Sequence, residues 1–140
     1  MPSPAYWLFK TEPSDYSFAD LTRDRRVVWE GVSNPTALGH LRAVKKGDVV
    51  AIYHTGNEKS VVGLAEVTRG AYPDPKLGDP KSVVVDLKPV RPLPAPVPLA
   101  DFRVDPVLKT TELVRISRLS VMPLSPAHFA RVLERAGEKP

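Results

Sequence analysis

The pattern of hydrophobic and polar positions predicts five β-strands. Residues 5–10 place apolar side chains at odd and even positions alike, which is typical of a strand covered on both faces. β-Branched residues are enriched over residues 49–54, 61–68, 82–88 and 115–122, and each segment is expected to be a strand. Gly56 and Asn57 favour a hairpin-like connection between the second and third strands. Strands of this number and length predict a small barrel.

Three helices are predicted from start signals that have a physical mechanism. Ser17 can cap a helix over residues 18–22, Asn34 one over residues 36–44 and Ser125 one over residues 127–136. In the last segment the apolar side chains recur at helical spacing. Shorter helical turns are expected over residues 99–102 and 112–115. Together these elements predict an α+β domain, a curved sheet with a few short helices.

Proline is unusually frequent in this chain. Sixteen prolines occur among 140 residues, and they are concentrated between Tyr72 and Pro106. Because proline fixes φ and lacks a backbone donor, the stretches YPDPKLGDP and KPVRPLPAPVP are expected to form extended edges and loops that divide neighbouring strands. The chain has the common length of one domain and shows no internal repeat. Residues 1–140 are therefore expected to share a single core.

Composition limits the possible functions. A net charge of +4 and a pI near 9.5 favour polyanionic partners, although they also fit an ordinary basic protein. The absence of cysteine excludes disulfides, thiolate metal sites and a thiol nucleophile. Apolar runs reach only about five residues, far below the roughly twenty that a membrane span requires. The amino terminus has no secretion signal, so a cytoplasmic location is expected.

Polar and aromatic residues follow two apolar segments. Lys10, Thr11 and Glu12 end the first strand before Pro13, and Trp29 follows two valines. An aromatic face provides stacking area, while an ammonium, a hydroxyl and a carboxylate can bind the polar edge of a flat ligand. A nucleobase is the commonest ligand of this kind. The sequence therefore suggests a small pocket for a nucleobase.

Each of these residues also has a structural interpretation. Trp29 could be a core residue, because tryptophan side chains are usually largely buried. The polar trio at residues 10–12 could cap the turn that follows the strand. Asn34 could bind a base, but Asn-Pro at a helix start is equally well explained as an N-cap. Both roles of Asn34 are compatible, because a capped helix N-terminus also attracts anions.

Several motifs occur in the order found in a known family. They are YWLFKTEPSD (residues 6–15), VWEGVSN (residues 28–34), Tyr53-His54, AYPDP (residues 71–75) and RLSVMP (residues 118–123). With them the chain closely resembles the EVE domain family over residues 6–133. The resemblance implies a PUA-like fold, with a five- to six-stranded curved sheet or pseudo-barrel and short flanking helices, related to the YTH and ASCH modules.

The resemblance also implies positions for a ligand site. The tryptophan of the family's W-x-G-V-x-N motif lines the pocket and falls on Trp29. The end of the first strand borders the pocket, the pair Tyr53-His54 has a role, and Ser120 lies near the cavity. Strand alternation sends Tyr53 and His54 to opposite faces, so one of them is expected to face the pocket.

This chain departs from the family at three positions. Ser33 and Leu38 stand where the family usually has arginine, and Ser82 stands where tryptophan is common. Two cations and one aromatic group are therefore missing near the expected site. The remaining candidates for phosphate contacts could equally be solvated charges; they are Arg42, Lys45, Lys46, Arg115 and Arg118.

No catalytic or metal constellation is recognisable. Ser120 lacks the G-x-S-x-G context and a triad. His40, His54 and His128 have no ligand-like spacing, and both His40 and His128 are expected to be solvated on helix surfaces. We therefore expect no cofactor, no metal and no enzymatic activity.

The first hypothesis is a monomeric, non-catalytic reader that takes a flipped, modified base of DNA or RNA into the pocket. The family implies it, since its members resemble binders of modified cytosines and other altered bases. An enzyme of RNA or nucleotide modification and a sensor of a free nucleobase-like ligand are the alternatives. The sequence does not identify the base, the polymer or the pathway.

Overall fold

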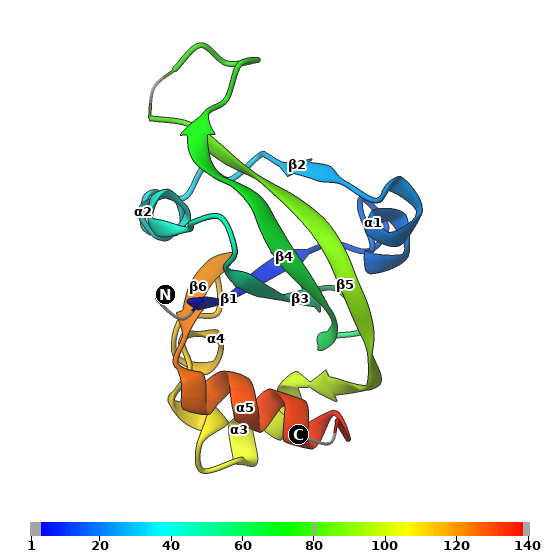
Figure 1. Cartoon of the computed structure of the whole chain (residues 1–140). Helices are drawn as coiled ribbons and strands as arrows, with labels where there is room; N and C mark the ends of the chain where they lie inside the picture. The colour runs from blue at the N-terminus through cyan, green and yellow to red at the C-terminus, as the bar shows by residue number, and fades with distance from the viewer. Residues whose placement is uncertain (1–3, 80, 139–140) are drawn as a thin grey trace.

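The computed structural model describes residues 4–79 and 81–138, which form one curved sheet with short helices around it (Figure 1). The strands are β1 (Tyr6–Thr11), β2 (Val27–Trp29), β3 (Val49–His54), β4 (Ser60–Pro73), β5 (Val83–Pro98) and β6 (Val121–Leu124). They form a six-stranded sheet in the order β2-β5-β4-β3-β1-β6. β1 and β3 are parallel, and the other pairs are antiparallel. The α+β, PUA-like prediction is confirmed.

The predicted helices begin at the predicted caps. They are α1 (Phe18–Asp24), α2 (Pro35–Ala43) and α5 (Pro126–Arg135), preceded by Ser17, Asn34 and Ser125. Each cap side chain accepts a hydrogen bond from the backbone N–H three residues later. Three short elements follow β5, namely α3 (Leu99–Val104), a 3₁₀ turn η1 (Leu108–Thr110) and α4 (Glu112–Arg115). They include both helical turns expected from the sequence.

Two strand predictions need correction, and one strand was missed. The predicted strand over residues 115–122 is helical at its start, and only β6 remains of it. β2 was not predicted as a strand, because three residues give no periodic signal and their pairing partner is β5. β5 continues through the proline-rich stretch to Pro98 instead of ending near residue 88.

The prolines of β5 are tolerated because of their spacing. Pro92, Pro94, Pro96 and Pro98 occupy every second position, and the intervening residues keep their N–H groups. β2 pairs only with residues 85–87 of β5, so the later half of β5 has β4 as its one strand neighbour. Edge strands accept proline in this way.

One hydrophobic cluster joins both sides of the sheet. Phe9 and Phe102 are fully buried, and Tyr6 stacks on Phe129 of α5 with ring centroids 4.2 Å apart. At the other end of the sheet, Phe18 lies so close to Gly63 of β4 that a Cβ there would be 2.5 Å from its ring. The start of α1 is thereby fixed on the sheet. No helix in the described part of the chain is long and apolar enough to cross a membrane.

Candidate functional site

A cavity of about 670 Å³ lies where the curved sheet fails to close. In the described part of the chain, β2 and β6 are the two edges of the sheet and do not pair with each other. The lining comes from β2 and the residues that follow it, 27–34, and from residues 118 and 120, which directly precede β6. The end of β1 and the following turn add residues 10–12, 15 and 16. The volume is within the range of small-molecule sites.

Trp29 is both a core residue and a wall of this cavity. Its side chain is 8% exposed and belongs to the hydrophobic core. Its ring lies 5.6 Å from the Phe9 ring and meets the Tyr16 ring edge-on at 6.4 Å. The same residue also lines the cavity. The two interpretations of Trp29 given by the sequence are therefore compatible.

Among the described residues the indole N–H of Trp29 has no hydrogen-bond acceptor. Trp29 is also one of the residues that line the cavity, so this N–H is a candidate donor to a ligand there. The residue offers a donor as well as part of an aromatic ring.

The trio at the end of β1 lines the cavity, but much of its bonding capacity is used within the protein. Lys10 Nζ donates to the Ser117 carbonyl at 2.7 Å, and burial lowers the pKa of Lys10. Thr11 Oγ1 donates to the Tyr16 carbonyl at 2.7 Å. The Lys10 ammonium keeps further hydrogens for a ligand, whereas the Thr11 hydroxyl can only accept.

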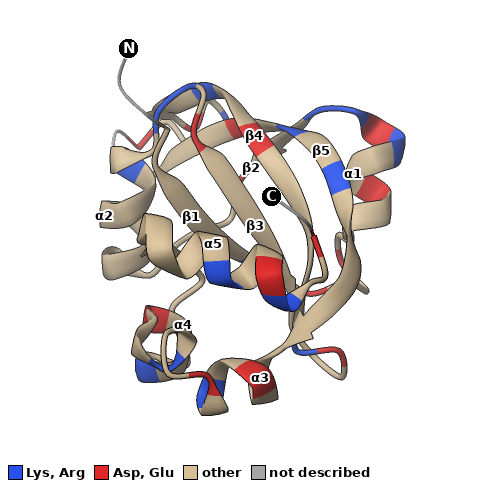
Figure 2. Ribbon diagram, turned by 60° about the horizontal axis from the view of Figure 1, so that its bottom comes forward, with Lys and Arg blue, Asp and Glu red and all other residues tan. Residues whose placement is uncertain are grey.

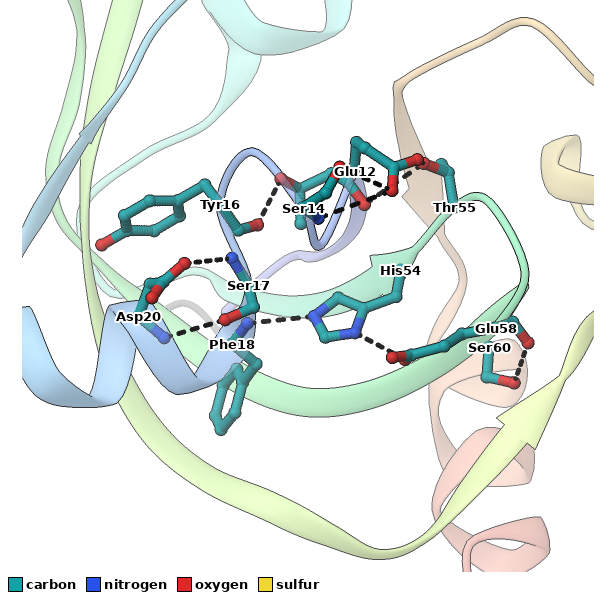
Figure 3. Close-up of polar contacts among 11 residues, drawn as sticks. Glu12, Ser14, Tyr16, Ser17, Phe18, Asp20, His54, Thr55, Glu58 and Ser60 are labelled. Carbon is teal, nitrogen blue, oxygen red and sulfur yellow. Dashed lines mark hydrogen bonds and ion pairs between the residues drawn. The ribbon is translucent and has the colours of Figure 1, made fainter.

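Glu12 holds the turn that follows β1 (Figure 3). Its carboxylate accepts from Thr55 Oγ1 at 2.9 Å and from Ser14 Oγ at 3.2 Å. The hydrogen bond from Thr55, supported by those from Ser14, lowers the pKa of Glu12. Glu12 thus shapes the wall of the cavity as an ionised group with protein partners.

Three further predicted residues line the cavity with free groups. Asn34 Oδ1 accepts from the Ala37 N–H at 3.0 Å as the cap of α2, which leaves the amide NH₂ to donate. Ser33 is exposed, and Ser120 is half-buried with its carbonyl accepting from the Lys10 N–H at 2.9 Å. All three lie among the lining residues. Leu38 is buried in the core, so this side chain does not take the place of a phosphate-binding arginine.

Tyr53 and His54 do not line the cavity, contrary to the expectation that one of them would face it. Both side chains are buried because both faces of β3 are covered. The Lys10 ammonium lies 5.8 Å from the centre of the Tyr53 ring. His54 Nε2 accepts the Phe18 N–H at 3.0 Å, and its Nδ1 lies 2.7 Å from the Glu58 carboxylate (Figure 3). Because Nε2 accepts a hydrogen bond, the proton of the ring lies on Nδ1, which faces the Glu58 carboxylate. Through its bond to Phe18, His54 joins the start of α1 to β3.

The five candidate phosphate contacts do not form one rim. Arg118 lines the cavity, and Arg115 lies 3.8 Å from Glu112. Arg42 donates to the Lys81 carbonyl at 2.7 Å. Lys45 and Lys46 line a second cavity of about 410 Å³ beside Asp48. Figure 2 shows basic and acidic residues interspersed over α3, α4 and α5.

Tyr16 is a cavity residue that the sequence analysis missed. It packs edge-on against Trp29, and its hydroxyl donates to Asp24 at 2.9 Å. Burial, together with the hydrogen bond to Asp24, raises the pKa of Tyr16 to about 12. A signal was present, because Tyr16 directly precedes the helix cap Ser17, where an apolar residue commonly packs against the helix.

Metal-binding clusters are absent from the described residues, where no three His, Cys, Asp or Glu side chains are grouped suitably. His128 is not the freely solvated side chain that was expected. Its Nε2 lies 2.7 Å from Thr110 Oγ1, and burial lowers the pKa of His128. His40 is also half-buried, with its ring 6.4 Å from that of Trp7.

The whole chain is similar to known proteins. A family model described as EVE domain matches residues 5–135. Thymocyte nuclear protein 1 from Gallus gallus is 30% identical over 169 aligned residues, covering 96% of this chain and 70% of the relative.

Two solved structures share the fold of this chain. The NMR structure of a Rhodopseudomonas palustris protein has a TM-score of 0.90 at 39% identity and covers 95% of this chain and 93% of that chain. The crystal structure of human THYN1 protein in complex with DNA containing 5-methylcytosine has a TM-score of 0.87 at 29% identity. It covers 97% of this chain and 99% of that chain.

Proposed function

This chain belongs to the EVE domain family, as its motifs predicted, and from that premise we propose that it is a non-catalytic reader of a modified base in DNA. The base is turned out of the helix and enters the cavity beside Trp29. The observation that carries the proposal is this cavity of about 670 Å³, which combines an aromatic wall with the remaining donor hydrogens of Lys10 and Asn34. The human relative solved with DNA containing 5-methylcytosine favours DNA and a modified cytosine as the ligand.

The free groups of the cavity suit the edge of a base. Trp29 Nε1–H, the Asn34 amide and the remaining Lys10 hydrogens are donors, and Ser120 Oγ can donate or accept. Cytosine presents two acceptors beside one amino donor, so Lys10 and Asn34 can bind its acceptors, while an acceptor of the lining such as Thr11 Oγ1 can bind its amino group. The exposed part of Trp29 and the neighbouring valines of β2 provide the apolar contact that a methyl group requires.

Phosphate contacts near the cavity are few. Arg118 lines the cavity and has no acidic partner in the described part of the chain. The carboxylates of Asp15 and Glu30 also lie on the lining, and they repel the DNA backbone. Recognition of the base is therefore expected to contribute more to specificity than contacts with phosphate.

Binding to matched oligonucleotides tests the proposal. Duplex DNA, single-stranded DNA and RNA are compared with cytosine or 5-methylcytosine at one position, together with the free modified nucleoside, at two salt concentrations. The reader hypothesis expects tighter binding of modified DNA and a salt-dependent affinity, because phosphate contacts release counterions. Preference for RNA would make RNA the ligand instead of DNA. Binding of the nucleoside alone, without salt dependence, would make the protein a sensor of a free nucleobase-like ligand. Turnover of any of these molecules would contradict a non-catalytic role.

A further inference from the structure

The loop between β4 and β5 carries an exposed leucine away from the sheet. The two long strands end together, and Figure 1 shows their connection projecting beyond all other elements at that end of the molecule. Leu77 lies in this loop and is 63% exposed. A single exposed apolar side chain is common on a protein surface, as Val104 at 74% exposure also shows, so the place of Leu77 in the molecule, and not its exposure alone, bears on its role.

The loop has internal hydrogen bonds that hold Leu77 in place. Asp74 is 6% exposed, and its Oδ1 accepts the Lys76 N–H at 2.9 Å. The Asp74 backbone N–H donates to the Ser82 carbonyl at 2.8 Å, and its carbonyl accepts the Leu77 N–H at 3.2 Å. The turn is therefore formed before any partner arrives, which lowers the entropy lost on binding.

The same loop is attached to the edge of the cavity. Lys76 Nζ lies 3.2 Å from the Glu30 carboxylate, and Glu30 is one of the lining residues. On the other side of the loop, Arg42 of α2 donates to the Lys81 carbonyl at 2.7 Å. Leu77 thus lies next to a residue that contacts the wall of the proposed base site.

We propose that Leu77 is a wedge that enters the base stack of duplex DNA when the modified base moves into the cavity. This inference rests on the proposed function. A flipped base leaves an apolar gap between its neighbours, and proteins that deform DNA commonly fill such a gap with an inserted apolar side chain. Leu77 is of suitable size, and it lies in the loop beside the site that holds the base.

The charges beside Leu77 favour DNA as the partner that covers it. Lys76 and Lys81 are exposed in the loop, and they outnumber its one exposed carboxylate, that of Asp79, which accepts the Lys81 backbone N–H at 2.9 Å. The ion pair between Lys76 and Glu30 joins side chains that are 73% and 44% exposed, so it is weak and Lys76 can exchange Glu30 for a phosphate. A stable protein interface, by contrast, buries about 800 Å² on each partner, far more than one leucine provides.

The substitution Leu77→Ser tests the wedge, with Val104→Ser as the matched control. Val104 is 74% exposed on α3, remote from the loop in Figure 1. Each variant is titrated with a duplex carrying one 5-methylcytosine and with the corresponding single strand, in which no stack has to be filled. A 2-aminopurine beside the modified base reports its unstacking.

Leu77→Ser is expected to weaken duplex binding by about tenfold and to suppress the 2-aminopurine signal, with less than about a twofold change on the single strand. Val104→Ser should bind both as the parent protein does, and Leu77→Met should restore duplex binding. Equal loss on duplex and single strand, or parent-like duplex binding by Leu77→Ser, would overturn the wedge alone. Failure of the parent protein to prefer modified DNA in either form would instead remove the proposed function.

Discussion

Trp7 and Trp29 have nearly the same exposure, 6% and 8%, but their indole N–H groups are used differently. Trp7 Nε1 donates to Asp48 Oδ2 at 2.9 Å, and this buried carboxylate also accepts the Lys45 and Ala5 N–H groups. Trp29 Nε1 has no acceptor among the described residues, and Trp29 lines the cavity. Burial alone therefore does not separate a structural tryptophan from a binding one, whereas the partner of its polar atom does.

The positions of the two residues in the sheet explain the difference. Trp7 lies in β1, between Val50 of β3 and Pro123 of β6. Trp29 lies in the edge strand β2 and has Val85 of β5 as its single strand partner. An edge strand leaves one side of its residues to solvent or to a ligand. All three residues of β2 line the cavity.

The largest expected effect is on stability, for Trp7→Ala. The substitution removes a buried aromatic side chain and leaves Asp48 without one of its three donors. Large-to-small changes of this kind cost about 3–5 kcal/mol in the free energy of unfolding. Urea denaturation should show this loss, while the fraction that remains folded binds modified DNA with unchanged affinity. A loss below about 1 kcal/mol would contradict the structural role of Trp7.

The next largest effect distinguishes the two tryptophans through binding. Trp29→Phe removes the free N–H and part of the ring that a base would contact, and stacking on an aromatic side chain is worth about 1–3 kcal/mol per base. We expect the dissociation constant for the modified strand to rise about tenfold or more, as measured by fluorescence anisotropy. Trp7→Phe is the control, expected to lower stability and leave the dissociation constant unchanged. The reverse pattern would exchange the roles of the two residues.

His54 sharpens the comparison in a third way, because it was expected at the binding site but has a structural role in the fold. His54→Ala leaves the Phe18 N–H without its acceptor at the start of α1. An unsatisfied buried backbone donor costs about 1–3 kcal/mol, so the midpoint of urea unfolding should fall. Below that transition, affinity for the modified nucleoside should stay close to that of the parent protein. A selective loss of nucleoside affinity with unchanged stability would make His54 a ligand contact.

The features predicted correctly from the sequence are those decided by near neighbours along the chain. Ser17, Asn34 and Ser125 each bond a backbone N–H three residues later, and all three helix starts were predicted. The family motif identified Trp29 and the end of β1 as neighbours of a pocket, and both line the cavity. Their contacts with a ligand stay a prediction.

The features that were missed depend on partners distant in sequence. β2 is a strand only because β5 pairs with it, and a three-residue segment has no periodicity of its own. The orientation of His54 is set by Phe18, which is 36 residues away. Tyr53 was expected to be a candidate for the pocket because it alternates with His54, but alternation does not reveal that both faces of β3 are covered.

The smallest expected effect concerns Ser33, which is exposed on the cavity lining where the family usually has arginine. Ser33→Arg should add one phosphate contact, raise oligonucleotide affinity at low salt and steepen log affinity against log salt by about 0.9 on a duplex or 0.7 on a single strand. Affinity for the free modified nucleoside should barely change, because it has no phosphate. Ala100→Arg, at an exposed position on α3, adds the same charge elsewhere and should leave the slope nearly unchanged. If Ser33→Arg instead alters nucleoside affinity at an unchanged slope, position 33 contacts the base, and base recognition extends from Trp29 to the N-terminus of α2.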